Sequence, residues 1–244
     1  AAVNAYRAIS IGEGELYITG GVEHMTRGPW VISKVSKPFG RDAQMHDSSF
    51  GWRFINPIMQ QKFGTDGMGQ TAENLVEMYG ISREDQDLFA YRSQMKATTA
   101  TENGRLDEEI CKVILPQRKK DDIVFEKDEF IKPATTLEKL GTLRAAFKKE
   151  GGSVTAGNSS GLNDGAAAMI LGTEEAANKN HLTPKSRIVG AAVAGVEPRI
   201  MGIGPVEATK KVLHRTGLSL NQMDIIELNE AFAAQSLACT RALG

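Results

Sequence analysis

The most constraining feature of this sequence is a glycine-rich run that leads into a stretch of small residues. The run extends from Gly151 to Gly165, and the small residues after it predict a strand from Ala166 to Leu171. Because glycine has no Cβ, the backbone of such a run can come very close to another segment or to a ligand. A tight loop whose glycines serve turn geometry alone would look the same, so both interpretations stay open.

Helix and strand patterns alternate near both ends of the chain. Small and apolar residues between Ala2 and Ile9 recur at helical spacing, and Leu16 to Thr19 predicts a short buried strand that Gly20-Gly21 should end. Beyond Pro184, the order strand, helix, strand, helix is predicted at 188–193, 206–214, 225–228 and after 229. This alternation is typical of an α/β fold with a largely parallel sheet and helices packed on it.

The segment from 28 to 150 departs from this pattern and reads as a mainly helical insertion. Its first part is irregular, yet it holds six of the chain's 9 Phe and 2 Trp residues, at 30, 39, 50, 52, 54 and 63. We expect a packed, functional excursion there rather than a linker. Further elements are predicted as a helix around 75–79, a helix capped at Ser82, strands at 113–115 and 123–125, and a helix at 137–147.

Composition and charge favour a globular protein with small-molecule or protein partners. The 244 residues are 41% hydrophobic and 24% charged, with a formal net charge of -1. This balance gives no drive toward nucleic acid or an anionic membrane surface, and no apolar run is long enough to span a membrane. The two cysteines form no C-x-x-C pair. Their spacing favours a reducing compartment, the cytoplasm or else an organelle matrix.

The usual signatures of metal and nucleotide chemistry are absent from the sequence. There is no G-x-x-x-x-G-K-[ST] or H-E-x-x-H motif, and Gly202-x-Gly204 lacks the third glycine of a dinucleotide fingerprint. The four histidines have no metal-ligand spacing, so we expect no metal site. Neither Cys111 nor Cys239 has the helix N-terminus or cationic neighbour that activates a thiolate, and both are interpreted as structural.

The stretch Asn229-Glu230-Ala231-Phe232 lies where a predicted strand passes into a helix, which is the edge where α/β folds place ligands. A carboxamide at this edge can hold a water or donate to a developing oxyanion. Alternatively, Asn229 caps the helix through its side chain. Basic residues near the glycine-rich run are candidates for phosphate contacts or are simply solvated, namely Lys132, Arg144, Lys148 and Lys149.

Taken together, four motifs resemble the thiolase family in order and spacing. They are GGVEHM at 20–25, VTAGNSSGLNDGAA at 154–167, MGIGP at 201–205 and NEAFAAQ at 229–235. The likeness runs the whole length of the chain. Residues 51–57, GWRFINP, and 227–235, ELNEAFAAQ, are most similar to degradative members such as β-ketoadipyl-CoA and 3-ketoacyl-CoA thiolases. His24 departs from the family pattern, which usually has a small polar residue there.

The resemblance implies a thiolase fold, in which two similar αβα halves stack in five layers and carry an inserted loop domain. Residues 1–27 and 151–183 would belong to the N-terminal half, 28–150 to the loop domain and 184–244 to the C-terminal half. The chain starts without methionine and stops directly after a helical pattern. We therefore expect an internal piece, incomplete at both ends.

The resemblance also implies a two-step acyl transfer through a cysteine. In the family the nucleophile belongs to a C-x-S-G motif, the histidine that activates it to G-H-P, and an acid-base cysteine to C-x-G-x-G. None of these motifs occurs in the 244 residues, so the piece alone should not turn over. Coenzyme A is expected as a substrate, with no permanently bound cofactor.

Residue roles carry over only where this sequence matches the family. Asn229 matches the asparagine that positions a water in an oxyanion hole, and Ala231 and Phe232 would line the pocket. Ala156 and Ser160 match residues beside the pantetheine arm. The other matches are Met68 and Met201 in the pocket, Phe147 near the adenine, and Lys132 where an arginine often approaches the nucleotide.

The parent protein is thus expected to be an acetyl-CoA acyltransferase of fatty acid or aromatic degradation. It would cleave a 3-oxoacyl-CoA with coenzyme A, and 3-oxoadipyl-CoA is the first candidate. The alternative is a thiolase-like protein that binds coenzyme A or lipid without catalysis. The family also implies a homodimer or homotetramer.

Overall fold

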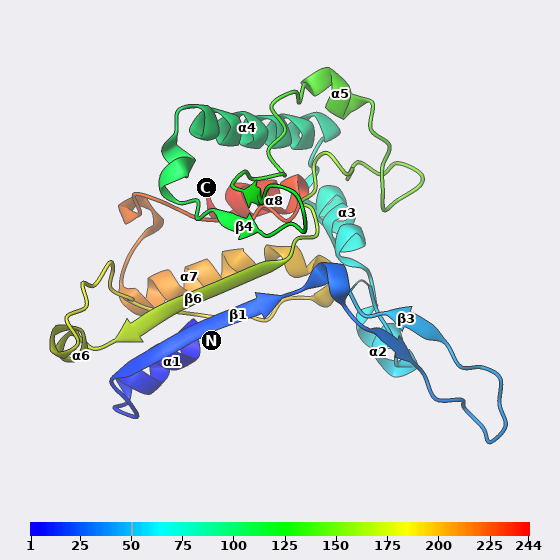
Figure 1. Cartoon of the computed structure of the whole chain (residues 1–244). Coiled ribbons are helices and arrows are strands. Elements are labelled where there is room, and N and C mark those ends of the chain that lie inside the picture. Colours follow the sequence, from blue (N-terminus) through cyan, green and yellow to red (C-terminus); the bar gives the residue numbers. More distant parts are fainter. Residues whose placement is uncertain (50) are drawn as a thin grey trace. The chain divides into compact units, whose positions relative to one another are not determined.

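The computed structural model describes residues 1–49 and 51–244, so Phe50, one of the aromatic residues noted in the sequence, lies outside the described residues. The chain forms two compact units. The first unit contains Ala1–Met68 and Leu162–Glu227, and the second contains Gly69–Gly161 and Leu228–Gly244. Figure 1 labels many of the elements and colours the chain along its sequence.

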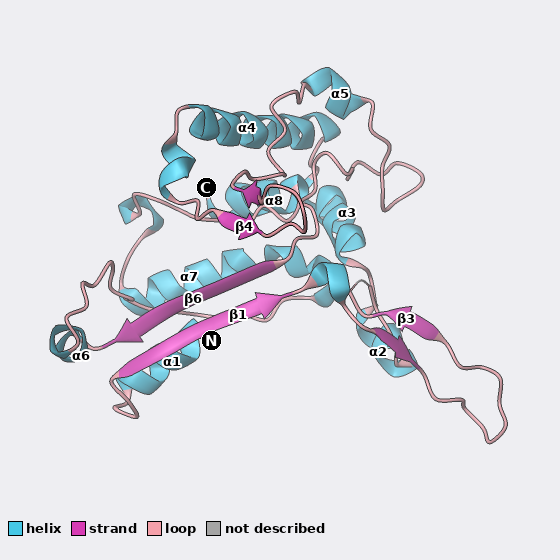
Figure 2. Cartoon of the chain, viewed as in Figure 1, coloured by secondary structure: helices cyan, strands magenta, loops and turns pink. Residues whose placement is uncertain are grey.

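The first unit is built on a long antiparallel ribbon, visible as the longest pair of arrows in Figure 2. Strand β1 (Leu16–Glu23) pairs with β6 (Gly165–Gly172), with Leu16 opposite Gly172 at one end and Glu23 opposite Gly165 at the other. Helix α1 (Ala2–Ser10) contacts both strands and buries Ala5. The predicted helix at the start of the chain and the predicted strand at 166–171 are confirmed.

The sequence predicted that this strand would end at its glycines. Strand β1 instead continues through Gly20-Gly21 to Glu23. The reason is a close approach between the two strands. A Cβ on Gly20 would lie 2.5 Å from the backbone oxygen of Ala167 on β6. Glycine is therefore needed inside this strand, where it allows contact rather than a turn.

The predicted largely parallel sheet is wrong for the described residues, in which the three sheets are two-stranded and antiparallel. The segments 188–193 and 225–228, predicted as strands, carry no strand assignment. An apolar run becomes a strand only when a neighbour satisfies its backbone groups. Val189, Val193 and Ile225 are instead exposed in these segments.

The helices of the first unit after β6 follow their sequence signals more closely. They are α6 (Glu174–Lys179), the 3-10 turn η3 (Pro198–Ile203), α7 (Gly204–Thr216) and the 3-10 turn η4 (Leu220–Gln222). Pro205 lies in the first turn of α7, and Gly217 ends the helix at φ +69°. These termini confirm the predicted helix, since proline tolerates a helix start and glycine a left-handed end.

The aromatic segment of the first unit forms small elements without a core of its own. It contains η1 (Met25–Arg27), a hairpin of β2 (Trp30–Ile32) and β3 (Met45–Asp47), and α2 (Pro57–Phe63), whose N-terminus Asn56 caps. The prediction that its aromatic residues are packed is wrong. The described ones are exposed, and they are Trp30, Phe39, Trp52, Phe54 and Phe63.

The second unit is mainly helical. Its elements are α3 (Met68–Tyr79, whose first residue belongs to the first unit), α4 (Arg83–Glu102), η2 (Arg105–Glu108), the hairpin of β4 (Val113–Leu115) and β5 (Ile123–Phe125), α5 (Leu137–Gly141) and α8 (Ala233–Leu243). The predicted helices at 75–79 and after Ser82 and both short strands are confirmed. A buried cluster of Ala72, Val154 and Ala234 joins α3, the glycine-rich run and α8.

Helix α5 is shorter than the predicted 137–147, because it ends at Gly141. Beyond it the chain is irregular, and Ala145 forms an isolated antiparallel bridge with Thr155 of the glycine-rich run. The pairing with the glycine-rich run therefore prevents the helix that the local pattern predicted. None of the helices in the described ranges is long and apolar enough to cross a membrane. The division into halves and loop domain stays a prediction.

Candidate functional site

The turn before α8 lies directly against the glycine-rich run in the second unit. The backbone N–H of Ser160 donates to the carbonyl of Ala231 at 2.9 Å, and the N–H of Ala233 donates to the carbonyl of Asn158 at 2.9 Å. Between these bonds, Ser159 and Phe232 form an isolated antiparallel bridge. The two segments that the sequence motifs singled out therefore share one short stretch of backbone pairing.

A buried carboxylate holds the start of the glycine-rich run. Glu73, on α3, is only 1% exposed. It accepts the backbone N–H groups of Ser153 and Val154, both at 2.9 Å. From α4, the Gln86 side chain donates to the Ser153 hydroxyl at 2.9 Å. The Glu73 carboxylate thus satisfies backbone donors that would otherwise be buried without partners, and Gln86 holds the Ser153 side chain.

A second buried group fixes the middle of the run. The Asn158 side chain accepts the Thr155 N–H at 2.8 Å, and it donates to Asp87 at 2.9 Å and to the Ser153 carbonyl at 3.1 Å. Asp87 also pairs with Arg83 at 2.8 Å. The run is consequently a well-anchored structure rather than a loose turn, which leaves its exposed residues in defined positions.

Asn229 does not cap the following helix, so that alternative is wrong. The N-cap of α8 is Phe232, and it makes no side-chain cap hydrogen bond. Asn229 is exposed three residues earlier. The neighbouring Glu230 accepts the Ser93 hydroxyl of α4 at 2.6 Å, which anchors the turn that presents Asn229.

Further predicted site residues of the second unit lie near this junction. Phe147 makes an edge-to-face contact with Phe232, with ring centroids 6.0 Å apart. Phe147 can take this place because Gly69 faces it, and a Cβ there would lie 2.2 Å from the ring. Ala156 and Ser160 are exposed on the run, and Ala231 is half-buried.

The basic residues near the run differ in their pairing. Lys132 is exposed, and its backbone N–H donates to the Gln94 side chain at 2.8 Å. Lys148 forms an ion pair with Glu77, which raises the pKa of Lys148, chiefly through the hydrogen bond between them. The charge of Lys148 is thus already engaged, while the resemblance assigns the nucleotide contact to Lys132.

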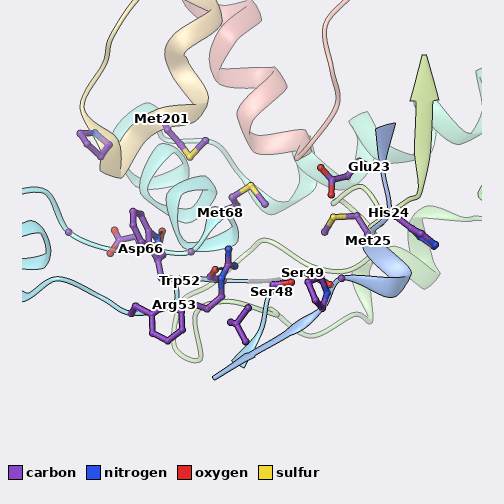
Figure 3. Close-up of a pocket in the computed structure, with 18 of the residues that line it drawn as sticks. Glu23, His24, Met25, Ser48, Ser49, Trp52, Arg53, Asp66, Met68 and Met201 are labelled. Atoms are coloured by element: carbon purple, nitrogen blue, oxygen red, sulfur yellow. Dashed lines mark hydrogen bonds between the residues drawn. The ribbon is translucent and has the colours of Figure 1, made fainter. Parts of the chain in front are cut away.

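A separate pocket lies within the first unit and contains both methionines predicted to line a pocket, Met68 and Met201. Its volume is about 1150 Å³. Figure 3 shows Trp52 and Arg53 in it together with these two side chains, and Glu23, His24 and Met25 also line it. Sequence reasoning did not name Trp52 and Arg53 as site residues, although GWRFINP was one of the two runs used to choose a subfamily.

The ion pairs of the first unit explain several charges around this pocket. Arg199 pairs with Asp66 at 2.9 Å. His24 pairs with Asp164 at 3.0 Å, and the Thr26 hydroxyl and N–H both donate to the same carboxylate. The hydrogen bonds from Thr26, with a smaller contribution from His24, lower the pKa of Asp164 to about 2.

The two cysteines have different environments. Cys111 is exposed, whereas Cys239 is buried in α8 and accepts the Gln235 side chain at 3.4 Å. Burial raises the pKa of the Cys239 thiol. A thiol with a raised pKa is a poor nucleophile, which agrees with the structural interpretation of this residue. Within the described part of the chain no cluster of His, Cys, Asp and Glu could hold a metal ion.

Comparison with known proteins gives matches along nearly the whole chain. The family model for the thiolase N-terminal domain matches residues 1–175, and the model for the thiolase C-terminal domain matches residues 182–244. A 3-oxoadipyl-CoA/3-oxo-5,6-dehydrosuberyl-CoA thiolase of Escherichia coli K12 is 54% identical over 240 residues. A β-ketoadipyl-CoA thiolase of Acinetobacter baylyi is 51% identical over the same length. Each alignment covers 98% of this chain and 60% of the relative.

Two solved structures are similar to this chain in fold as well as in sequence. The crystal structure of the Bacillus anthracis acetyl-CoA acetyltransferase superposes with a TM-score of 0.85 at 43% identity, over 100% of this chain and 60% of the other. The human mitochondrial 3-ketoacyl-CoA thiolase gives a TM-score of 0.87 at 40% identity, over 99% and 59%. The chain thus has the α/β thiolase fold and spans about 60% of the length of the curated relatives it matches. Since the two family models together account for all but a few of its residues, the chain belongs to the thiolase family.

Proposed function

We propose that the full-length protein is an acetyl-CoA acyltransferase that cleaves a 3-oxoacyl-CoA, with 3-oxoadipyl-CoA as the first candidate. Its cysteine thiolate would attack the C3 carbonyl, and the bond between C2 and C3 would break to release acetyl-CoA after protonation of the enolate. The thiol of a second coenzyme A would then take the shortened acyl group from the cysteine. The names of the relatives from Escherichia coli and Acinetobacter baylyi support this substrate.

The backbone pairing between the glycine-rich run and the turn before α8 is the observation that carries the proposal. It brings exposed Ser160 and the turn that presents Asn229 into one structure. In the proposed mechanism, Asn229 holds the water of an oxyanion hole, and its amide stabilises the negative charge that develops in the transition state. Ser160 and Ala156 lie beside the pantetheine arm, while Ala231 and Phe232 line its pocket.

The remaining assignments concern the rest of the coenzyme and the acyl group. Phe147 lies near the adenine, and Lys132 supplies a point charge to the phosphates without the planar fork of an arginine. Met68 and Met201 line the space for the acyl group. Coenzyme A acts as substrate, and no cofactor stays bound. We further propose a cytoplasmic homodimer or homotetramer.

The test is to express the full-length protein and to follow cleavage of 3-oxoacyl-CoA substrates by loss of their enolate absorbance. Asn229→Ala should lower kcat by about 100-fold, the usual effect of losing one oxyanion donor. The matched control is Asn221→Ala, which removes an exposed carboxamide from η4 and should leave kcat unchanged. If the folded wild-type protein cleaves no substrate yet binds coenzyme A, the non-catalytic, thiolase-like alternative is correct.

A further inference from the structure

The pocket of the first unit has more cationic groups than its own acids neutralise. Three arginines line it, Arg27, Arg53 and Arg199, against two carboxylates, Glu23 and Asp66. Asp66 is already paired with Arg199 at 2.9 Å. The pocket lining therefore has an excess of positive charge. In the part of the chain that the structure describes, this excess belongs to Arg27 and Arg53, which form no ion pair with Glu23 or Asp66.

Arg53 is the arginine best placed to use this charge on a ligand. It is half-buried, whereas Arg27 is exposed. One of its nitrogens, Nη1, donates to the carbonyl of Gly51 at 2.5 Å. Among the described residues, no salt bridge to Arg53 is formed. A guanidinium has five N–H donors in a planar fork, so this one contact leaves several of them for a carboxylate.

Asp47 is the acidic neighbour that responds to Arg53. Its pKa is lowered first by hydrogen bonds from Ser49 and then, to a smaller extent, by the charge of Arg53. The Asp47 carboxylate accepts the Ser49 N–H at 2.8 Å, so it is used in its own turn and makes no ion pair with the guanidinium. Asp47 therefore does not occupy the donors of Arg53.

The other walls of the pocket are mainly apolar. Beside Arg53 stand Trp52 and Phe54, and the same space is lined by Met25, Phe63, Met68 and Met201. A volume of about 1150 Å³ is larger than an acetyl group needs and is comparable to pockets for drug-sized ligands. Apolar walls with one half-buried guanidinium complement a chain that is apolar along its length and anionic at its end.

We propose that Arg53 binds the terminal carboxylate of a dicarboxylic 3-oxoacyl chain, whose methylene groups lie against Trp52, Met68 and Met201. The assignment rests on the proposed function and adds to it the residue that selects the substrate. Arg53 is a specificity residue in this scheme, since it contacts the far end of the acyl chain and takes no part in bond cleavage.

The experiment compares two substrates of equal chain length in the full-length protein. 3-Oxoadipyl-CoA ends in a carboxylate, and 3-oxohexanoyl-CoA ends in a methyl group. Arg53→Gln should lower kcat/KM for 3-oxoadipyl-CoA by about 10- to 100-fold, the effect of losing a charge-assisted hydrogen bond, and should change kcat/KM for 3-oxohexanoyl-CoA by less than about 3-fold. Arg53→Lys keeps the charge without the fork and should show an intermediate loss. Arg118→Gln is the matched control, with the same change of charge on an exposed arginine outside the pocket lining.

The outcomes separate the inference from the proposed function. Equal losses for both substrates in Arg53→Gln would mean that Arg53 contacts coenzyme A itself or the fold, and would overturn the inference while leaving thiolysis intact. The same holds if the wild-type protein shows no preference for 3-oxoadipyl-CoA. If Arg53→Gln does not fold, Arg53→Lys decides, because an unchanged substrate ratio in it would also overturn the assignment. Absence of cleavage of either substrate by the wild-type protein would reject the proposed function and Arg53's role with it.

Discussion

At the scale of the residue, Asp164 makes the stability of the first unit depend on pH. Its carboxylate is held by Thr26 and His24, and its pKa falls from 3.8 to about 2. Because the folded pKa is the lower one, the ionised carboxylate contributes stability above about pH 4, and this contribution is lost as the pH falls toward 2. Asp164→Asn should therefore be less stable than the wild-type protein at pH 7, and the difference should shrink below pH 4.

Urea midpoints at pH 7, 5, 4 and 3 measure this effect. Asp121→Asn is a suitable control, since Asp121 is an exposed aspartate on another loop. Its midpoint should differ little from that of the wild-type protein at each pH. A gap between Asp164→Asn and the wild-type protein that stays constant from pH 7 to pH 3 would contradict the role given to Thr26 and His24.

At the scale of the element, helix α3 supports the glycine-rich run through Glu73. Replacing it in Glu73→Ala leaves the buried N–H groups of Ser153 and Val154 without their acceptor. Each lost partner costs about 1–3 kcal/mol, so we expect a loss of about 3 kcal/mol in the free energy of unfolding. Hydrogen exchange at these two amides should also become faster.

The same helix offers a matched control in Glu77, whose side chain is 62% exposed and pairs with Lys148. Exposed ion pairs contribute about 0–1 kcal/mol, so Glu77→Ala should be nearly neutral. Denaturant titration of both variants decides the question. Similar losses in the two would show that Glu73 supports α3 alone and not the run.

Elements governed by neighbours in sequence could be predicted, and elements governed by distant neighbours could not. The Ser82 cap of α4 and the helix at 206–214, which forms α7, depend on local chemistry, and both were predicted. The continuation of β1 through Gly20 depends on Ala167, which lies far along the chain. The early end of α5 likewise depends on the bridge from Ala145 to Thr155.

The candidate site divides in the same way. The motif resemblance singled out Asn229 and Ser160, and their segments do pair in the structure. It did not indicate Glu73, because a glutamate inside an amphipathic helix pattern is usually a surface residue, whereas here it is buried against Ser153 and Val154. Arg53 was missed for a related reason, since its pocket is assembled from segments on both sides of the second unit's sequence.

At the scale of the whole molecule, the 244-residue chain exposes apolar strand surface in its first unit. Ile18 and Val22 on β1 are 82% and 80% exposed, and Ile225, which lies outside the strands, is 80% exposed. Strands β1 and β6 pair with each other alone among the described residues, so each has one unpaired edge. Apolar surface beside free edges favours association between molecules.

We therefore expect the 244-residue chain, expressed by itself, to self-associate as its concentration rises and to bind a dye that reports exposed apolar surface. The double variant Ile18→Lys/Ile225→Lys should reduce both effects while the far-ultraviolet circular dichroism stays the same, because it places charges in exposed apolar surface and beside a strand edge. Sedimentation velocity at about 10 and 100 µM measures the association. Ile11→Lys is the control, because Ile11 is 78% exposed but belongs to no strand, since it lies at the end of α1. A chain that stays monomeric at both concentrations without binding dye would show that this surface does not drive association, and equal effects of the control and the double variant would assign any association to general charge instead.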